Sequence, residues 1–103
     1  MKLITKALAK KTPSLYSTEN VSDPTAQFKL FTPSASFTWY VTEFDGKDRM
    51  FGLVDNGREK ELGYFSLSEL ERVRGPWGLG VERDRSFSSR PLSEVTQVAN
   101  LER

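Results

Sequence analysis

The residues of this chain that could do chemistry are carboxylates, arginines, lysines and tyrosines, because the sequence contains no histidine and no cysteine. Histidine is the commonest general base and metal ligand, and cysteine supplies thiolates, disulfides and most structural zinc sites. The sequence therefore excludes histidine-based catalysis, thiolate chemistry and the usual structural zinc site. The stretch WYVTEFDGKDRMFG gathers several acids and bases among aromatic residues, and it is the first candidate for a carboxylate site.

The charges of this stretch fit a β-hairpin. Alternation along the first strand places Glu43 on the same face as Trp39. A three-residue loop at 45–47 would then set Glu43 opposite Arg49. The shorter Asp-Gly turn would instead oppose Glu43 to Asp48, and two like charges that face each other directly are unfavourable. The sequence therefore predicts the three-residue loop.

Most of the charged residues in this hairpin are then explained by the structure of the turn alone. Asp45 and Asp48 are turn residues, and Gly46 is expected near the left-handed conformation of the loop. Glu43 keeps two interpretations, a cross-strand partner of Arg49 or a functional carboxylate near the edge of the core.

A second hairpin follows directly. The dipeptide Asn56-Gly57 is typical of a two-residue type I′ turn. Such a turn sets Asp55 opposite Arg58, so these charges also have a structural explanation.

Three carboxylates offer an alternative site for a hard cation. Glu82 and Asp84 alternate along the segment VERDR, on the side opposite Arg83 and Arg85. Together with Glu43 they would form an oxygen-rich site for magnesium or manganese, and hence a divalent-metal-dependent enzyme. The other interpretation of VERDR is an edge strand whose charges discourage pairing with further chains.

The arginines support a third interpretation. Five arginines fall within residues 72–90, and they could bind phosphate groups or an acidic partner. Arg83 and Arg85, together with a lysine-rich N-terminal helix, would make a weak nucleic-acid binder. Neighbouring acids largely neutralise this stretch, and a net charge of +1 is no footprint for nucleic acid. A protein partner is therefore favoured over nucleic acid.

The segment GPWGLG at 75–80 is glycine-rich but lacks the spacing of a phosphate-binding loop. It predicts a helix stop and a bend, with Trp77 either packed onto the sheet or exposed at its rim. An exposed Trp77 would be a natural anchor, since tryptophan and arginine dominate interface energetics. The candidate binding surface comprises Trp77, Tyr64, Arg83 and Arg85.

Residue periodicity and turn residues predict the elements that must position these groups. We expect helices at 2–11, from a capping box of Ser66 and Glu69, and from Pro91 with Leu92, Val95 and Ala99 on one side. We expect strands at 27–32, 37–44, 49–54 and 61–65, and a further extended segment at VERDRSF. The class is α+β, a four- to five-stranded antiparallel meander with an N-terminal, a short middle and a C-terminal helix packed on one side. Residues 1–103 are expected to form a single domain.

Composition is that of an ordinary globular chain, with 37% apolar and 12% aromatic residues. No apolar run is long enough to span a membrane, and the basic N-terminal segment has too short an apolar stretch for a signal-peptide core. We therefore expect a soluble, cytoplasmic protein without a membrane partner or a cofactor.

Four segments together resemble an uncharacterised family of roughly hundred-residue bacterial proteins, a domain of unknown function. They are LYSTENVSDP, FTWYVTEFDG, ELGYFSLSEL and RGPWGLGVERDRSF. The resemblance covers nearly the whole chain and implies an accessory protein of the kind often carried on plasmids and integrative elements. It implies no activity, cofactor or catalytic residue. Trp77 stands where this resemblance leads us to expect a smaller aliphatic residue.

These observations favour a small non-enzymatic binding module from a mobile element, with a host protein as its partner, such as one of a defence system. The metal-dependent enzyme with Glu43, Glu82 and Asp84 is the alternative from another class. The weak nucleic-acid binder is the third.

Overall fold

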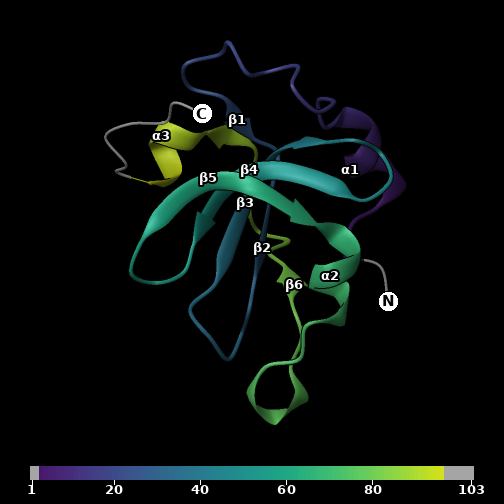
Figure 1. Cartoon of the computed structure of the whole chain (residues 1–103), viewed down its shortest axis with the longest axis vertical. Helices are drawn as coiled ribbons and strands as arrows, with labels where there is room; N and C mark the ends of the chain where they lie inside the picture. The colour runs from purple at the N-terminus through teal and green to yellow at the C-terminus, as the bar shows by residue number, and fades with distance from the viewer. Residues whose placement is uncertain (1–2, 97–103) are drawn as a thin grey trace.

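An antiparallel sheet of five strands forms the centre of the structure, a computed structural model that describes residues 3–96 (Figure 1). The strands lie in the order β5-β4-β3-β2-β6, so β2 to β5 form a meander and β6 joins beside β2. Their bounds are β2 Phe28–Phe31, β3 Thr38–Phe44, β4 Arg49–Asp55, β5 Lys60–Ser66 and β6 Glu82–Arg83. A second antiparallel pair consists of β1 Thr25–Ala26 and β7 Arg90–Pro91. The α+β class and the antiparallel meander are confirmed.

A β-bulge in β3 decides which way its side chains point. Glu43 lies opposite Phe51, whereas Val41 lies opposite Gly52, so Thr42 is an extra residue in the ladder. The Thr42 hydroxyl donates to the Phe51 carbonyl at 3.1 Å. A bulge shifts the alternation of side chains by one residue. Glu43 therefore faces away from the side that Val41 occupies, and the prediction that both share one face is wrong.

The register predicted for this hairpin is also wrong, because the turn lies further along the chain. The Asp45 N–H donates to the Arg49 carbonyl at 2.9 Å, so the three-residue loop is 46–48 and begins one residue later than predicted. Glu43 consequently does not lie opposite Arg49. Gly46 does adopt the expected left-handed backbone, with φ of 85°.

The second hairpin differs from prediction in a similar way. Asp55 lies opposite Lys60 and not opposite Arg58, and the Asn56 N–H donates to the Glu59 carbonyl at 3.1 Å, so the two loop residues are Gly57 and Arg58, one residue later than predicted. Gly57 has a left-handed backbone and Asn56 does not, so Asn56-Gly57 does not form a type I′ turn. The Asn56 side chain stabilises this loop, because its oxygen accepts from the N–H groups of Arg58 and Glu59 at 2.9 and 2.8 Å. Asparagine thus acts through its side chain here.

The helices are short. They are α1 Lys6–Lys11, α2 Leu67–Arg72 and α3 Leu92–Val95, with a 3₁₀ turn η1 at Pro76–Gly78. Across residues 3–96, no helix has the length and apolar character needed to cross a membrane.

The first helix begins later than the predicted range of 2–11. Thr5 is its N-cap, and the Thr5 hydroxyl oxygen accepts from the Leu8 N–H at 3.1 Å. Leu3 and Ile4 precede the cap and are buried in the core. A threonine cap satisfies a free helical N–H group, so the cap sets the start of the helix although the apolar spacing continues upstream.

The middle helix begins as predicted. The Ser66 hydroxyl oxygen accepts from the Glu69 N–H at 3.3 Å, the main contact of the expected cap. The C-terminal helix also begins after Pro91, and Leu92 is fully buried. Ala99, expected on the same stripe, lies outside the described residues.

The sheet has an apolar cluster on each face. The larger cluster packs with side chains of α1 and α2 and contains Leu3, Ile4, Phe28, Leu30, Trp39, Val41, Phe44, Met50, Leu70 and Val81. The smaller one contains Ala26, Leu53 and Leu92, with Tyr40, Leu62, Phe87 and Val95 packed against it. Neighbours along a strand point to opposite faces, so Leu53 and Val54 mark the two sides. The prediction that all three helices pack on one side of the sheet is therefore correct for α1 and α2 and wrong for α3, which packs on the other face.

Asp48 joins the first hairpin to the start of α2. Its carboxylate accepts from the Ser66 hydroxyl at 2.6 Å and from the Ser68 N–H at 2.7 Å. Its backbone carbonyl accepts from the Leu67 N–H at 2.8 Å. The hydrogen bonds from the Ser66 hydroxyl and then from the Ser68 N–H lower the pKa of Asp48. This aspartate is structural, as predicted, but it fixes a helix as well as a turn.

We expect Asp48→Asn to lower the free energy of unfolding at neutral pH, because an amide is a weaker acceptor than a carboxylate. Since the folded pKa is lowered, the carboxylate contributes stability above its unfolded pKa of about 4 and loses it as pH falls through the folded value. The difference between wild type and variant should therefore shrink in acid. Urea unfolding across this pH range measures it, with Glu59→Gln as a control. A difference that is constant with pH would contradict the assignment.

Candidate functional site

Trp77 is the most exposed large apolar side chain described, with 89% of its surface accessible. It lies at the tip of the loop between α2 and β6, which projects from the body of the molecule (green, below β6 and α2 in Figure 1). Its backbone is left-handed, with φ of 60°, a conformation that is uncommon for a residue other than glycine. The structure therefore decides between the two interpretations of Trp77: the side chain is exposed and does not pack on the sheet.

Hydrogen bonds within the loop hold this conformation. The Gly75 N–H donates to the Leu79 carbonyl at 2.6 Å, and the Gly78 N–H donates to the Gly75 carbonyl at 3.0 Å. At the base of the loop, the Arg74 guanidinium donates to the carbonyls of Val73 and Glu71 at 2.7 and 3.1 Å. Arg74 thus serves the loop and does not stand free as part of an arginine patch.

Tyr64 lies in an aromatic cluster on β5. Its ring centroid is 4.7 Å from that of Phe51 and 6.0 Å from that of Tyr16, and the Arg49 guanidinium carbon lies 5.8 Å from its centroid. These contacts leave 43% of Tyr64 exposed. The ring therefore contributes to packing as well as to the surface.

Arg83 and Arg85 lie at the other edge of the sheet. Arg83 is half-buried on β6, where it pairs with Leu30 of β2. The strand ends at Arg83, and the carboxylate of the next residue, Asp84, accepts from the Ser86 N–H at 2.9 Å and begins a turn. Arg83 pairs with Leu30, whereas Asp84 bonds to the Lys29 carbonyl and forms an ion pair with the Lys29 side chain, so Arg83 and Asp84 lie on opposite faces. The predicted alternation therefore holds for Arg83 and Asp84, although Asp84 and both arginines line one hollow at this edge of the sheet.

The four residues of the predicted binding surface do not form one patch. Tyr64 is on β5 and Arg83 on β6, and these are the two edge strands. At about 4.8 Å between neighbouring strands, the edges are about 19 Å apart. Trp77 precedes β6 and Arg85 follows it. The structure therefore offers a tryptophan loop and an arginine-lined hollow near β6, with Tyr64 distant from them.

Glu43 is fully buried, and its carboxylate organises the loop between α1 and β1. One oxygen accepts from the Tyr16 N–H at 2.7 Å, and the other accepts from the Thr18 N–H at 2.9 Å. The Thr18 hydroxyl also donates to it. Tyr16 has a left-handed backbone with φ of 70°. These contacts give Glu43 a structural role as the acceptor for a tight turn.

The three carboxylates of the predicted metal site do not converge. Glu82 pairs with Phe31, which in turn pairs with Thr38 at the far end of β3 from Glu43. The five steps along the strand from residue 38 to residue 43 correspond to about 16 Å. Asp84 instead forms an ion pair with Lys29 at 3.5 Å. Within residues 3–96, no cluster of three or more acidic side chains could hold a metal ion.

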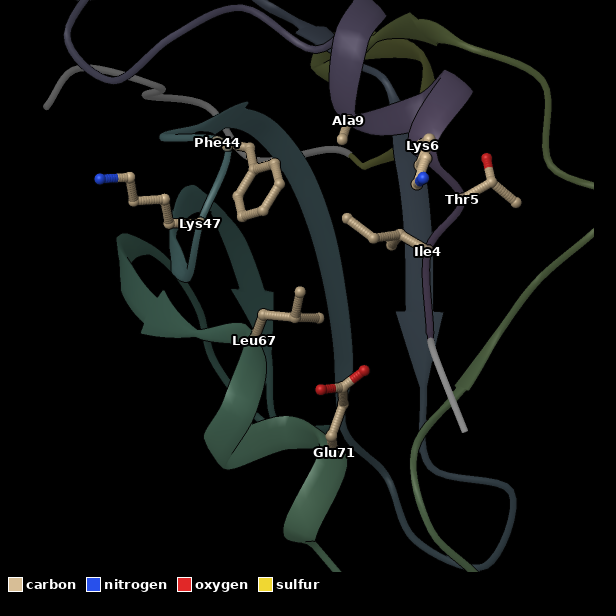
Figure 2. Close-up of a pocket in the computed structure, with 9 residues that line it drawn as sticks. Ile4, Thr5, Lys6, Ala9, Phe44, Lys47, Leu67 and Glu71 are labelled. Carbon is tan, nitrogen blue, oxygen red and sulfur yellow. The ribbon is translucent and has the colours of Figure 1, made fainter.

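A hollow between α1, α2 and the first hairpin is mainly apolar (Figure 2). Figure 2 shows Ile4, Phe44 and Leu67 directed toward one another around it. Its volume is about 220 Å³, below the roughly 300–1,000 Å³ of typical small-molecule sites. Glu71 at its edge is engaged, because its carboxylate accepts from the Leu3 N–H at 3.2 Å. This hollow is best described as a gap between packed elements.

Sequence reasoning missed the residues that surround Glu43. Tyr16 and Thr18 stand in a segment without periodicity, so nothing in their spacing indicates a contact with β3. A signal was present for the bulge itself, since the apolar positions change from odd at Val41 to even at Phe44. This change from odd to even positions turns Glu43 away from the face of Val41 and toward the loop between α1 and β1.

A family model described as Protein of unknown function (DUF2958) matches residues 1–102. The chain belongs to this family. The resemblance to an uncharacterised family is thus confirmed, and the DUF2958 description assigns no activity, ligand or site residue. No curated protein and no solved structure matches the chain. Any function of this DUF2958 chain must therefore be argued from its geometry.

We expect Glu43→Gln to lower the free energy of unfolding by about 1.5–3 kcal/mol, since the N–H groups of Tyr16 and Thr18 would lose a carboxylate acceptor. Thr18→Val should cost about 1 kcal/mol. The double variant should cost less than the sum, because both changes remove one shared interaction. Urea unfolding of the four proteins measures this coupling. Strictly additive effects would contradict the proposed role of Glu43.

The backbone at Trp77 gives a separate expectation. Trp77→Gly should be more stable than Trp77→Ala by about 1 kcal/mol, because glycine adopts a left-handed backbone without the Cβ penalty. Both variants remove the same exposed ring, so each serves as the control for the other. Thermal unfolding measures the difference, and equal stabilities would show that the left-handed conformation is not maintained.

Proposed function

We propose that this protein is a small non-enzymatic binding module that docks on a protein partner through the loop 74–80, with Trp77 as the anchor. The observation that carries the proposal is a tryptophan with 89% of its surface exposed. Tryptophan buries a large area on binding and is enriched among the residues that dominate interface energies. A side chain with this exposure adds little to the packing of the core, so folding does not explain why the residue is apolar.

The construction of the loop supports the same function. Hydrogen bonds among Gly75, Gly78 and Leu79 fix the backbone on either side of the ring. A pre-organised loop loses less conformational entropy when it binds. Leu79, also exposed, adds apolar surface beside the anchor. The loop therefore presents a rigid apolar tip.

The partner that fits such a tip is a protein with an apolar pocket. The loop alone is smaller than a stable interface, which buries about 800 Å² on each side. The partner must therefore also cover polar surface around the base of the loop, where Arg72 and Glu82 are exposed. Following the resemblance to proteins carried on mobile elements, we place the partner in the bacterial host, among its defence proteins.

The test compares the wild type with Trp77→Ala in binding to a partner captured from host lysate and then purified. We expect Trp77→Ala to weaken the affinity by about 30-fold or more, corresponding to about 2 kcal/mol. Val21→Ala is the matched control, because Val21 is also an exposed apolar residue, with 49% of its surface accessible. Calorimetry measures the affinities.

The proposal fails if Trp77→Ala binds as tightly as the wild type, or if Val21→Ala weakens binding equally. A steep, log-linear loss of affinity with salt would also contradict it, because that behaviour indicates binding to a nucleic-acid backbone.

A further inference from the structure

A second hollow, lined by basic side chains, lies between α1 and the segment that follows β6. Lys11 comes from the end of α1, while Arg83 and Arg85 come from β6 and the residues after it. The hollow has a volume of about 450 Å³, within the range of roughly 300–1,000 Å³ typical of small-molecule sites. Segments far apart in the sequence therefore bring three positive charges to one concave surface.

These three cations lack acidic partners in the part of the chain that is described. The one ion pair among residues 3–96 joins Lys29 to Asp84. Asp84 also lines the hollow, but its carboxylate is shared with Lys29 and with the Ser86 N–H. Like charges that line one hollow repel, and an anion bound in the hollow lowers that cost.

Neutral groups complete the lining. The Thr5 hydroxyl oxygen accepts from the Leu8 N–H, so its proton is directed elsewhere and can be donated to a ligand. Gln27 and Ser89 add further donors, and Leu8 and Phe28 supply apolar surface. The hollow thus combines hydrogen-bond donors with an apolar side that could contact an organic group.

We propose that this hollow binds the phosphate group of a small organic phosphate of the nucleotide class. A phosphate monoester carries a charge of about −1.5 to −2 at neutral pH, which matches a hollow lined by three cations better than a single carboxylate does. Arginine forks bind phosphate oxygens in pairs, and a lysine adds a point charge. Arg83 is half-buried and its backbone is held in the β2–β6 ladder, so the position from which this side chain reaches the hollow is fixed before the ligand arrives.

This site is separate from the tryptophan loop. The loop lies before β6 and the hollow after it, so a variant of one leaves the residues of the other unchanged. The two proposals can therefore fail independently.

The test titrates the full chain with adenosine monophosphate, adenosine and inorganic phosphate by calorimetry. We expect adenosine monophosphate to bind at submillimolar concentration, inorganic phosphate to compete with it, and adenosine to bind much more weakly. Arg85→Ala and Lys11→Ala, both at exposed positions, should each weaken binding by about tenfold or more. Arg58→Ala is the matched control, since it removes one exposed arginine outside the hollow.

In the small-molecule titrations, two results would overturn the proposal. The first is no binding of adenosine monophosphate at millimolar concentration, and the second is that Arg58→Ala weakens its binding as much as Arg85→Ala and Lys11→Ala do. A further arm compares a short single-stranded oligonucleotide with and without a 5′-phosphate. Tighter binding of the phosphorylated strand supports the same phosphate site, with a nucleic-acid end as its source. Equal binding of the two strands shows recognition of the phosphodiester backbone and contradicts the proposal.

Discussion

The buried carboxylate of Glu43, turned to its face by one extra residue at Thr42, is the constraint on which much of the structure depends. Without the bulge, Glu43 would point into the apolar cluster beneath α1 and α2, where a charge is very costly to bury. With it, the carboxylate meets the N–H groups of Tyr16 and Thr18, and Phe44 takes the place in the core. Gly52 makes this arrangement feasible, because a Cβ there would lie 1.9 Å from the Tyr40 carbonyl oxygen.

The two surfaces to which we assign binding both adjoin β6, the shortest strand of the sheet. Only two residue pairs join β6 to β2, through Leu30 and Phe31. The tryptophan loop enters this strand and the basic hollow begins where it ends, so the same short ladder positions both. Two of the acids predicted as metal ligands instead accept hydrogen bonds that stabilise turns. Asp84 accepts in the turn that follows β6, and Glu43 accepts in the loop between α1 and β1.

Much of the fold could be predicted from the sequence because its signals are local. The strands of the meander, the cap at Ser66 and the left-handed Gly46 all follow from residue types within a few positions. The registers failed for a physical reason: the position of each loop depends on side chains such as Asp45 and Asn56, which accept several backbone N–H groups at once, and both loops begin one residue later than predicted. The sequence did not show that the candidate binding residues lie apart, because spacing along a chain does not reveal that Tyr64 and Arg83 lie on opposite edge strands.

The pairing of β1 with β7 has a consequence for the order of folding. Thr25 meets Pro91, so most of the chain lies within the loop that this contact closes, whereas the pairs β2–β3, β3–β4 and β4–β5 each join strands that are neighbours in the sequence. Closing a long loop costs more chain entropy than closing a hairpin. We therefore expect the hairpins of the meander to form before the β1–β7 and β2–β6 ladders, which join segments further apart in the sequence. The two surfaces to which we assign binding both adjoin β6, so on this order they are completed after the meander that supports them.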